Sequence, residues 1–203
     1  MPTRLRSSNE KRTRTLIIKL LTEIQSSPKG ELERPLRTRL WAMITENKNT
    51  NEQKQILTKL NIVCVQHGIG FWTKKFGNDR RIEPVLTVAL QAASGAFNEA
   101  DAMAVRDGFY VSLVENECYE PDEWPAMFVA HAAANSIVTA VSDVQFGADQ
   151  RDQDLDPEAF EPDYLVASAF AGGLSDDGNP ELRRAFWRWY LSVAVPQVIS
   201  DLP

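Results

Sequence analysis

Apolar residues recur at intervals of three and four along almost the whole chain, the spacing that places side chains on one face of an α-helix. A short stripe near the start contains Leu16, Leu20 and Ile24. A longer stripe contains Ile56, Leu60, Val63, Cys64, His67 and Phe71. No long segment alternates apolar and polar residues as a half-buried strand would. We therefore predict an all-α protein, a single-domain helical bundle of about seven or eight helices.

Proline, glycine and capping residues predict where these helices begin and end. Asn98 with Asp101 resembles a helix start, and Asn179-Pro180 combines an N-cap with proline at the first helical position. The predicted helices cover residues 31–44, 51–75, 84–96, 98–118, 122–146, 162–171 and 180–196, and the first of these is interrupted or begins at Pro35. Pro196 is expected to kink or end the last one. Residues 1–28 are predicted to form a basic N-terminal helix or arm, and residues 29–203 the all-α domain.

Charge is distributed unevenly along the chain. Residues 1–83 contain 17 Lys and Arg against 8 Asp and Glu, whereas residues 84–203 contain 5 basic and 20 acidic residues. Residues 149–163 contain one arginine and seven acids, which are Asp149, Asp152, Asp154, Asp156, Glu158, Glu161 and Asp163. Fixed carboxylates attract cationic partners and accelerate their association. These seven acids are the candidate binding surface, and the alternative is a solvated acidic loop.

The residue patterns of metal sites and active sites are weakly represented. Asp152, Asp154 and Asp156 have the spacing of the first ligands of an EF-hand loop, but Pro157 occupies the place of the required glycine. The two cysteines, 54 positions apart at Cys64 and Cys118, match no metal motif. The chain has no phosphate-binding glycine loop and no nucleophile elbow. We expect no metal, no cofactor and no catalytic residue.

The sequence points to the cytoplasm. The longest uncharged stretch, residues 124–142, contains polar residues and six alanines, so we expect a buried helix and no membrane association. The apolar run at residues 16–21 is too short for a signal peptide, and a low cysteine count suits a reducing compartment. The basic N-terminal segment lacks interleaved aromatic residues and the net charge is −6, so we expect no nucleic-acid partner.

The last predicted helix carries two apolar stripes rich in aromatic residues. The first stripe contains Leu182, Phe186, Trp189 and Val193, and the second contains Trp187, Tyr190, Leu191 and Ala194. Such a helix is buried on most sides, or buries one side and offers the other to a partner. We assign these aromatic residues mainly to the core, and we expect His67, on its own apolar stripe, to pack there too.

The segment from Arg184 to Leu191, RAFWRWYL, followed by Ala194-Val195-Pro196, resembles the C-terminal signature of a bacterial family. This family is the all-α immunity protein type 5 family of polymorphic toxin systems. An aromatic helix end at residues 71–76, an acidic–basic turn at 78–81 and a segment that closes on Gly172-Gly173 also resemble it. The resemblance covers about residues 41–196. Its motif residues are Phe186, Trp187, Trp189, Tyr190, Pro196 and Trp72.

The resemblance implies a protein without enzymatic activity that binds and neutralises a cognate toxin domain in the cytoplasm. An acidic inhibitor is complementary in charge to a nuclease toxin, because the active-site clefts of nucleases are basic. We therefore hypothesise that the seven acids of residues 149–163 contact the toxin. Two alternatives stay open: a helical interaction or scaffold protein without a toxin partner, and an enzyme whose site is assembled from dispersed carboxylates. The sequence leaves the toxin and the oligomeric state open.

Overall fold

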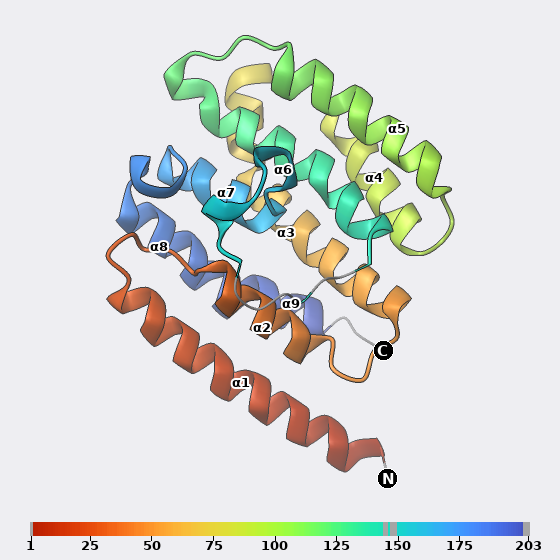
Figure 1. Ribbon diagram of the computed structural model, residues 1–203, viewed down its shortest axis with the longest axis vertical. Coiled ribbons are helices and arrows are strands. Elements are labelled where there is room, and N and C mark those ends of the chain that lie inside the picture. Colours follow the sequence, from red (N-terminus) through yellow and green to blue (C-terminus); the bar gives the residue numbers. More distant parts are fainter. Residues whose placement is uncertain (1, 144–145, 147–149, 201–203) are drawn as a thin grey trace.

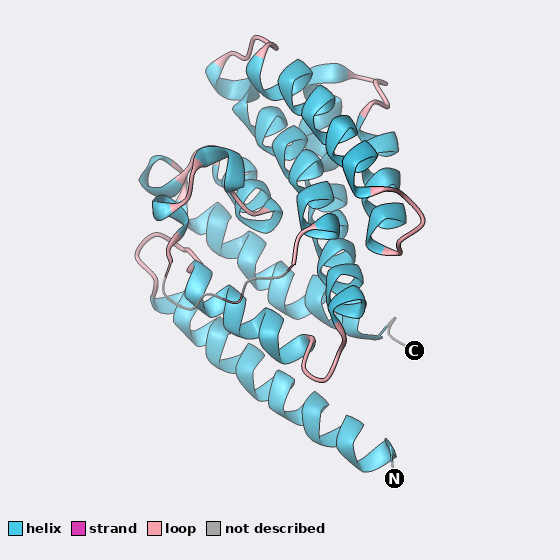
Figure 2. Cartoon of the chain, turned by 45° about the vertical axis from the view of Figure 1, so that its right-hand side comes forward, coloured by secondary structure: helices cyan, strands magenta, loops and turns pink. Residues whose placement is uncertain are grey.

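The computed structural model describes residues 2–143, 146 and 150–200 (Figure 1). Its α-helices are α1 (Pro2–Ser26), α2 (Arg34–Ile44), α3 (Thr50–Phe76), α4 (Ile82–Ala93), α5 (Glu99–Tyr110), α6 (Trp124–Val141), α7 (Pro162–Ala171), α8 (Pro180–Trp189) and α9 (Val195–Ser200). Short 3-10 and π-helical segments join several of them. The described residues form no strand, so the predicted all-α single-domain fold is confirmed (Figure 2).

Helix α6 lies at the centre of the bundle and packs against α3, α4, α5 and α7 (Figure 1). Its alanines at 130, 132, 133 and 134 are fully buried, and such small side chains let neighbouring helices approach closely. The stretch Pro121–Val141 is long and apolar enough to cross a membrane, with a mean hydropathy of 1.2. However, 67% of its most apolar window is buried inside the fold, as in the core helix of a bundle.

Helix α1 contributes to the same core and is fastened to α8. Its buried apolar residues are Leu16, Leu20 and Ile24. Arg184 of α8 donates from Nε to the Ile24 carbonyl oxygen at 3.1 Å and from Nη2 to the Ser27 carbonyl oxygen at 2.7 Å. The same two carbonyl oxygens also accept the N–H groups of Ser27 and Gly30 at 3.3 and 3.1 Å, so Arg184 adds a second donor to each at the end of α1. In the following turn Gly30 has a φ of +64°, and any Cβ there would collide with the Pro180 carbonyl.

Several predicted helix ends differ from the structure. The helix predicted for residues 98–118 is α5 up to Tyr110, followed by the π-helical segment η1 (Val111–Glu115). The helix predicted for 122–146 ends earlier, at Val141, because Ser142 adopts an extended backbone with a ψ of 149°.

The last helix does not end at Pro196. The π-helical segment η6 (Tyr190–Ala194) follows α8, and the Val195 N–H donates to the Tyr190 carbonyl oxygen five residues back. Helix α9 then continues through Pro196. Proline is tolerated there because the first turn of a helix needs no amide hydrogen from it.

The C-terminal aromatic residues are divided between the core and the surface. Phe186, Trp187 and Tyr190 are buried, and the Tyr190 hydroxyl accepts a hydrogen bond from Trp41 Nε1 at 2.8 Å. Trp189 is half-buried, and the apolar residues Leu182, Val193 and Pro196 of this region are exposed. The second predicted stripe thus fills the core, and the first is partly open to solvent.

His67 is exposed, so the prediction that it packs in the core is wrong. Its ring stacks on Trp189 with 3.6 Å between ring centroids, and on Phe170 with 4.8 Å. These aromatic neighbours cover the faces of the imidazole at the surface of the bundle, where its ring nitrogens can still be hydrated.

Trp72 closes the end of α3. Its side chain is 1% exposed, and its Nε1 donates to the Asp79 carbonyl oxygen at 2.7 Å. The buried indole therefore holds the turn between α3 and α4 against the core.

Gly68 and Gly70 of α3 provide a matched test of core packing. A Cβ at Gly68 would lie 3.0 Å from Val129 Cγ2 and 3.2 Å from Val166 Cγ1, whereas one at Gly70 would meet nothing within 4 Å. We expect Gly68→Leu to lower the free energy of unfolding by about 1–3 kcal/mol through overpacking. Gly70→Leu should leave it unchanged or raise it by up to about 1 kcal/mol through helix propensity. Urea unfolding measures both, and equal losses would contradict close packing at Gly68.

Candidate functional site

One buried arginine gathers the acidic segment against the bundle. Arg37 of α2 has a fully buried side chain, and it donates from Nη2 and Nη1 to the two carboxylate oxygens of Asp152 at 2.6 and 3.0 Å. Its Nη2 also donates to Glu161 Oε2 at 2.7 Å, and its Nε lies 3.3 Å from Asp163 Oδ2. The guanidinium carbon lies 5.3 Å from the ring centre of Trp187. Arg37 thus joins three acids of residues 149–163 to the aromatic core.

Burial makes this cluster costly to disrupt. Glu161 bridges two arginines, since its Oε1 accepts a hydrogen bond from Arg34 Nε at 3.0 Å. Burial raises the pKa of Asp163 above its usual range, although the neighbouring Arg37 lowers it. Burial likewise raises the pKa of Glu31, beside Arg37, to about 7. Removal of Arg37 would take the compensating charge from Asp152 and Asp163 in the interior, whereas Glu161 would keep Arg34 and Glu31 would keep Arg183, whose Nε lies 3.3 Å from Glu31 Oε2.

A second anchor for the segment comes from α6. The Asn135 side-chain Nδ2 donates to the backbone carbonyl oxygens of Glu158 and Phe160, both at 2.8 Å. Its Oδ1 accepts a hydrogen bond from Arg106 Nη2 at 3.3 Å. His131 lies one turn earlier, and burial lowers its pKa to about 4, so the imidazole is neutral at pH 7. Asn135 thereby fixes the backbone on both sides of the short turn at residue 159.

The described acids of the predicted surface divide into two sets. Three face Arg37: Asp152 and Asp163 are buried, and Glu161 is half-buried. The exposed set consists of Asp154, Asp156 and Glu158. Asp149 lies outside the described residues. The charge available to a partner in this part of the segment is therefore carried by the exposed set.

Local turns fix the backbone that carries the exposed acids. Asp154 lies in the 3-10 segment η3 (Asp152–Asp154), and its Oδ2 accepts the Arg151 N–H at 3.1 Å. Asp156 precedes the 3-10 segment η4 (Pro157–Ala159), and its Oδ1 accepts the Glu158 N–H at 3.0 Å. Each of these two carboxylates keeps one further oxygen for solvent or a partner.

The EF-hand-like spacing of this segment does not produce an ion-binding loop. Asp152 is paired with Arg37, while Asp154 and Asp156 each cap their own turn. In the described part of the chain, no group of three or more His, Cys, Asp and Glu side chains is arranged to hold a metal ion.

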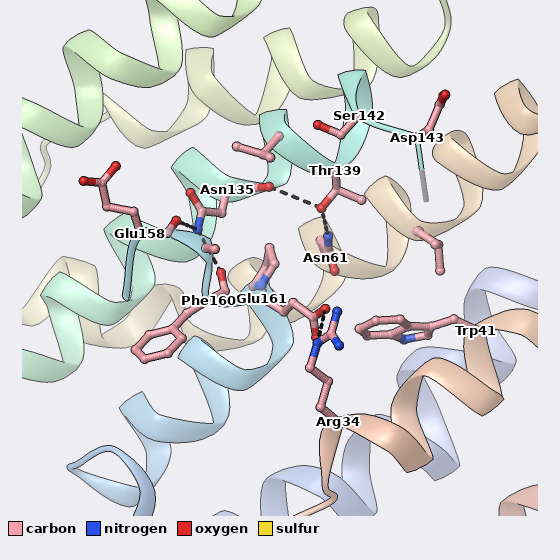
Figure 3. Close-up of a pocket in the computed structure, with 14 residues that line it drawn as sticks. Arg34, Trp41, Asn61, Asn135, Thr139, Ser142, Asp143, Glu158, Phe160 and Glu161 are labelled. Atoms are coloured by element: carbon pink, nitrogen blue, oxygen red, sulfur yellow. Dashed lines mark hydrogen bonds and ion pairs between the residues drawn. The ribbon is translucent and has the colours of Figure 1, made fainter. Parts of the chain in front are cut away.

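A cleft of about 220 Å³ lies beside the acidic segment, between α2, α3 and the C-terminal half of α6 (Figure 3). The large apolar side chains that line it are those of Trp41, Leu57, Val138 and Phe160, and Ala159 and Pro162 also contribute to its lining. Asn61 donates from Nδ2 to Thr139 Oγ1 at 2.9 Å in its wall. Glu158 and Asp143 lie at opposite ends of the cleft (Figure 3). Glu158 thus belongs both to the exposed acids and to the lining of the cleft, and Asp154 and Asp156 precede it by four and two positions in the chain.

Sequence reasoning missed the two side chains that organise the acidic segment. Arg37 stands in an i, i+3, i+4, i+7 pattern with Leu40, Trp41 and Ile44, so an arginine occupies the apolar stripe of its helix. That position was the available signal, because a charged residue on a buried stripe needs counter-ions. Asn135 gave a weaker signal as an amide inside a long alanine-rich helix.

Arg37→Ala tests whether the buried cluster stabilises the fold. We expect a loss of about 3–5 kcal/mol in the free energy of unfolding, because the substitution leaves buried carboxylates unpaired. Arg39→Ala is the matched control, since Arg39 is exposed on the same helix. It should change the free energy of unfolding by less than about 0.5 kcal/mol. Urea unfolding measures both variants. Similar losses in their free energy of unfolding would show that the buried cluster stabilises the fold no more than an exposed arginine does.

Similarity to known proteins indicates the kind of protein to which this site belongs. No curated protein is similar enough to the chain to be matched to it. A family model described as Immunity protein Imm5 matches residues 17–197. The matched span includes the Arg37 cluster, the cleft, the aromatic C-terminal motif and the end of α1, and it exceeds the resemblance over residues 41–196. The chain therefore belongs to the Imm5 family of immunity proteins, which act against toxins.

Proposed function

We propose that this chain neutralises a cognate bacterial toxin domain by stoichiometric binding, and that the toxin contacts the face that carries Asp154, Asp156 and Glu158. The observation that supports this most directly is the division of the acidic segment. Its inward acids are paired with arginines inside the protein, whereas its outward acids are exposed on turns that hold their backbone in place.

The arrangement favours a cationic partner. Glu158 has a side chain that is 61% exposed and lies 3.9 Å from Arg106 Nη1, a distance at which its charge is only partly compensated. Carboxylates on a pre-formed backbone need little ordering when a partner binds, so less conformational entropy is lost. Complementary charge also raises association rates by about 10–10³-fold at low ionic strength.

A nuclease domain is the class of toxin that this face suits. Nuclease clefts are lined by cations that hold phosphates, and an acidic inhibitor can occupy or cover such a cleft. In this proposal the chain catalyses no reaction and acts in the cytoplasm, where a toxin of this kind would meet its substrate. Both points rest on family membership, and the first also on the absence of a recognised catalytic motif in the sequence.

The test starts with the toxin domain that co-purifies with the chain from the producing bacterium. Co-production of the chain should restore growth of cells that express this domain, and the purified pair should bind one-to-one. The combined variant Asp154→Asn, Asp156→Asn, Glu158→Gln keeps the side-chain oxygens that cap the turns. We expect its association rate to fall about tenfold or more at low salt, with a smaller loss at high salt.

A matched variant separates the local effect from the change in net charge. Glu83→Gln, Glu99→Gln, Asp101→Asn removes the same number of charges from exposed positions on α4 and α5. It should retain most of the association rate. Equal rates for the two triple variants would place the toxin elsewhere on the chain, and a chain that gives no growth protection against the domain would overturn the proposed function.

A further inference from the structure

The cleft beside the acidic segment has apolar walls, and the side-chain N–H groups of its two asparagines already donate hydrogen bonds within the protein. Of the residues that line it, Trp41 and Leu57 are 9% and 5% exposed, and Val138 and Phe160 are half-buried. The Asn61 amide is bonded to Thr139, and the Asn135 amide to the backbone of Glu158 and Phe160. An occupant that fills the cleft therefore gains mainly from burying apolar surface.

The size of the cleft limits what can enter it. Its volume of about 220 Å³ lies below the roughly 300–1,000 Å³ of pockets that enclose small-molecule ligands. One large side chain is a better match, and protein interfaces commonly place a single aromatic anchor in such a pocket.

Charge at the ends of the cleft defines what should flank that side chain. Asp143 at one end has a side chain that is 76% exposed, and Glu158 stands at the other end (Figure 3). The neighbouring cation at the Asp143 end, Lys54, is 16% exposed and 3.1 Å from the carboxylate, so the acid is the more accessible partner. Glu161 and Arg34 between the two ends neutralise each other at 3.0 Å. The ends thus present negative charge on both sides of an apolar centre.

We infer that the cleft is the anchor site of the toxin interface, and that it takes one large apolar side chain, aromatic by preference, flanked by lysine or arginine. This rests on the proposed function and adds to it the chemistry of the contacting segment. The exposed acids attract the partner, and the cleft supplies the short-range contact that slows its release.

Two tripeptides test the site without any toxin. The probes are acetyl-Lys-Trp-Lys-amide and acetyl-Glu-Trp-Glu-amide, titrated into the full ¹⁵N-labelled chain and followed by NMR. We expect the lysine peptide to shift the backbone amides of Thr139 and Ala159 and the side-chain amide of Asn61. Its affinity should exceed that of the glutamate peptide several-fold at low salt, and added salt should narrow the difference.

Two alanine substitutions provide the control. Ala159 is exposed and lines the cleft, so Ala159→Trp should fill the site and abolish the shifts. Ala96 is exposed in the turn between α4 and α5, and Ala96→Trp should leave them intact. The NMR spectrum of each variant shows that it is folded.

Three results would overturn the inference: no saturable shift in the cleft, equal affinity for the two peptides, or unchanged lysine-peptide binding by Ala159→Trp. A failure here would leave toxin binding through the exposed acids to be judged by the triple variants. Conversely, the chain could bind the lysine peptide and give no growth protection against a toxin domain. That result would support the cleft as a peptide-binding site and contradict the proposed function.

Discussion

The charge cluster around Arg37 is the interaction on which the acidic face depends. A guanidinium group with no exposed surface is unfavourable unless carboxylates compensate it, and residues 149–163 supply three of them. The same contacts hold the part of the chain that leads into α7, because Asp152 lies in η3 and Asp163 lies in the first turn of α7. Helix α2 and the acidic segment are therefore coupled through Arg37, and Arg34 of the same helix adds an ion pair to Glu161 at 3.0 Å.

Because of this coupling, the described carboxylates of residues 149–163 fall into two groups with different surroundings. The inward carboxylates fasten the segment to the core, and the outward carboxylates remain on the surface on short 3-10 turns. Asn135 adds a neutral clamp from α6 that fixes the backbone without using any of the acids. A binding surface on an otherwise irregular loop can in this way be held in a defined shape.

The sequence was sufficient for the class of fold and for most of the helices, because apolar spacing and capping residues are local signals. Helix α7 lies within the predicted limits, and α8 begins at Pro180 as expected. The π-helical segments were not predictable, since their hydrogen bonds depend on packing as well as on local spacing. The helix does not end at Pro196, one of the two outcomes expected for this proline, because a π-helical segment lets a new helical turn start there.

The candidate site was predicted less well, for a physical reason. Sequence composition marks a concentration of acids but carries no record of which ones a distant arginine will pair with. Arg37 is 115 positions from Asp152, and only the folded chain brings them together. The aromatic C-terminal motif shows the same limit in milder form: Trp187 is fully buried, whereas Trp189, two residues later, is half-buried and stacks on His67.

The most direct test of the central claim is hydrogen–deuterium exchange of the full chain, alone and saturated with its toxin domain. We expect added protection of backbone amides at residues 153–160 and 138–143, which surround the exposed acids and the cleft. Exchange on the exposed sides of α1 and α4 should be unchanged. Protection confined to α1 or to the exposed side of α8, with residues 153–160 exchanging as in the free chain, would contradict an acidic toxin-facing surface.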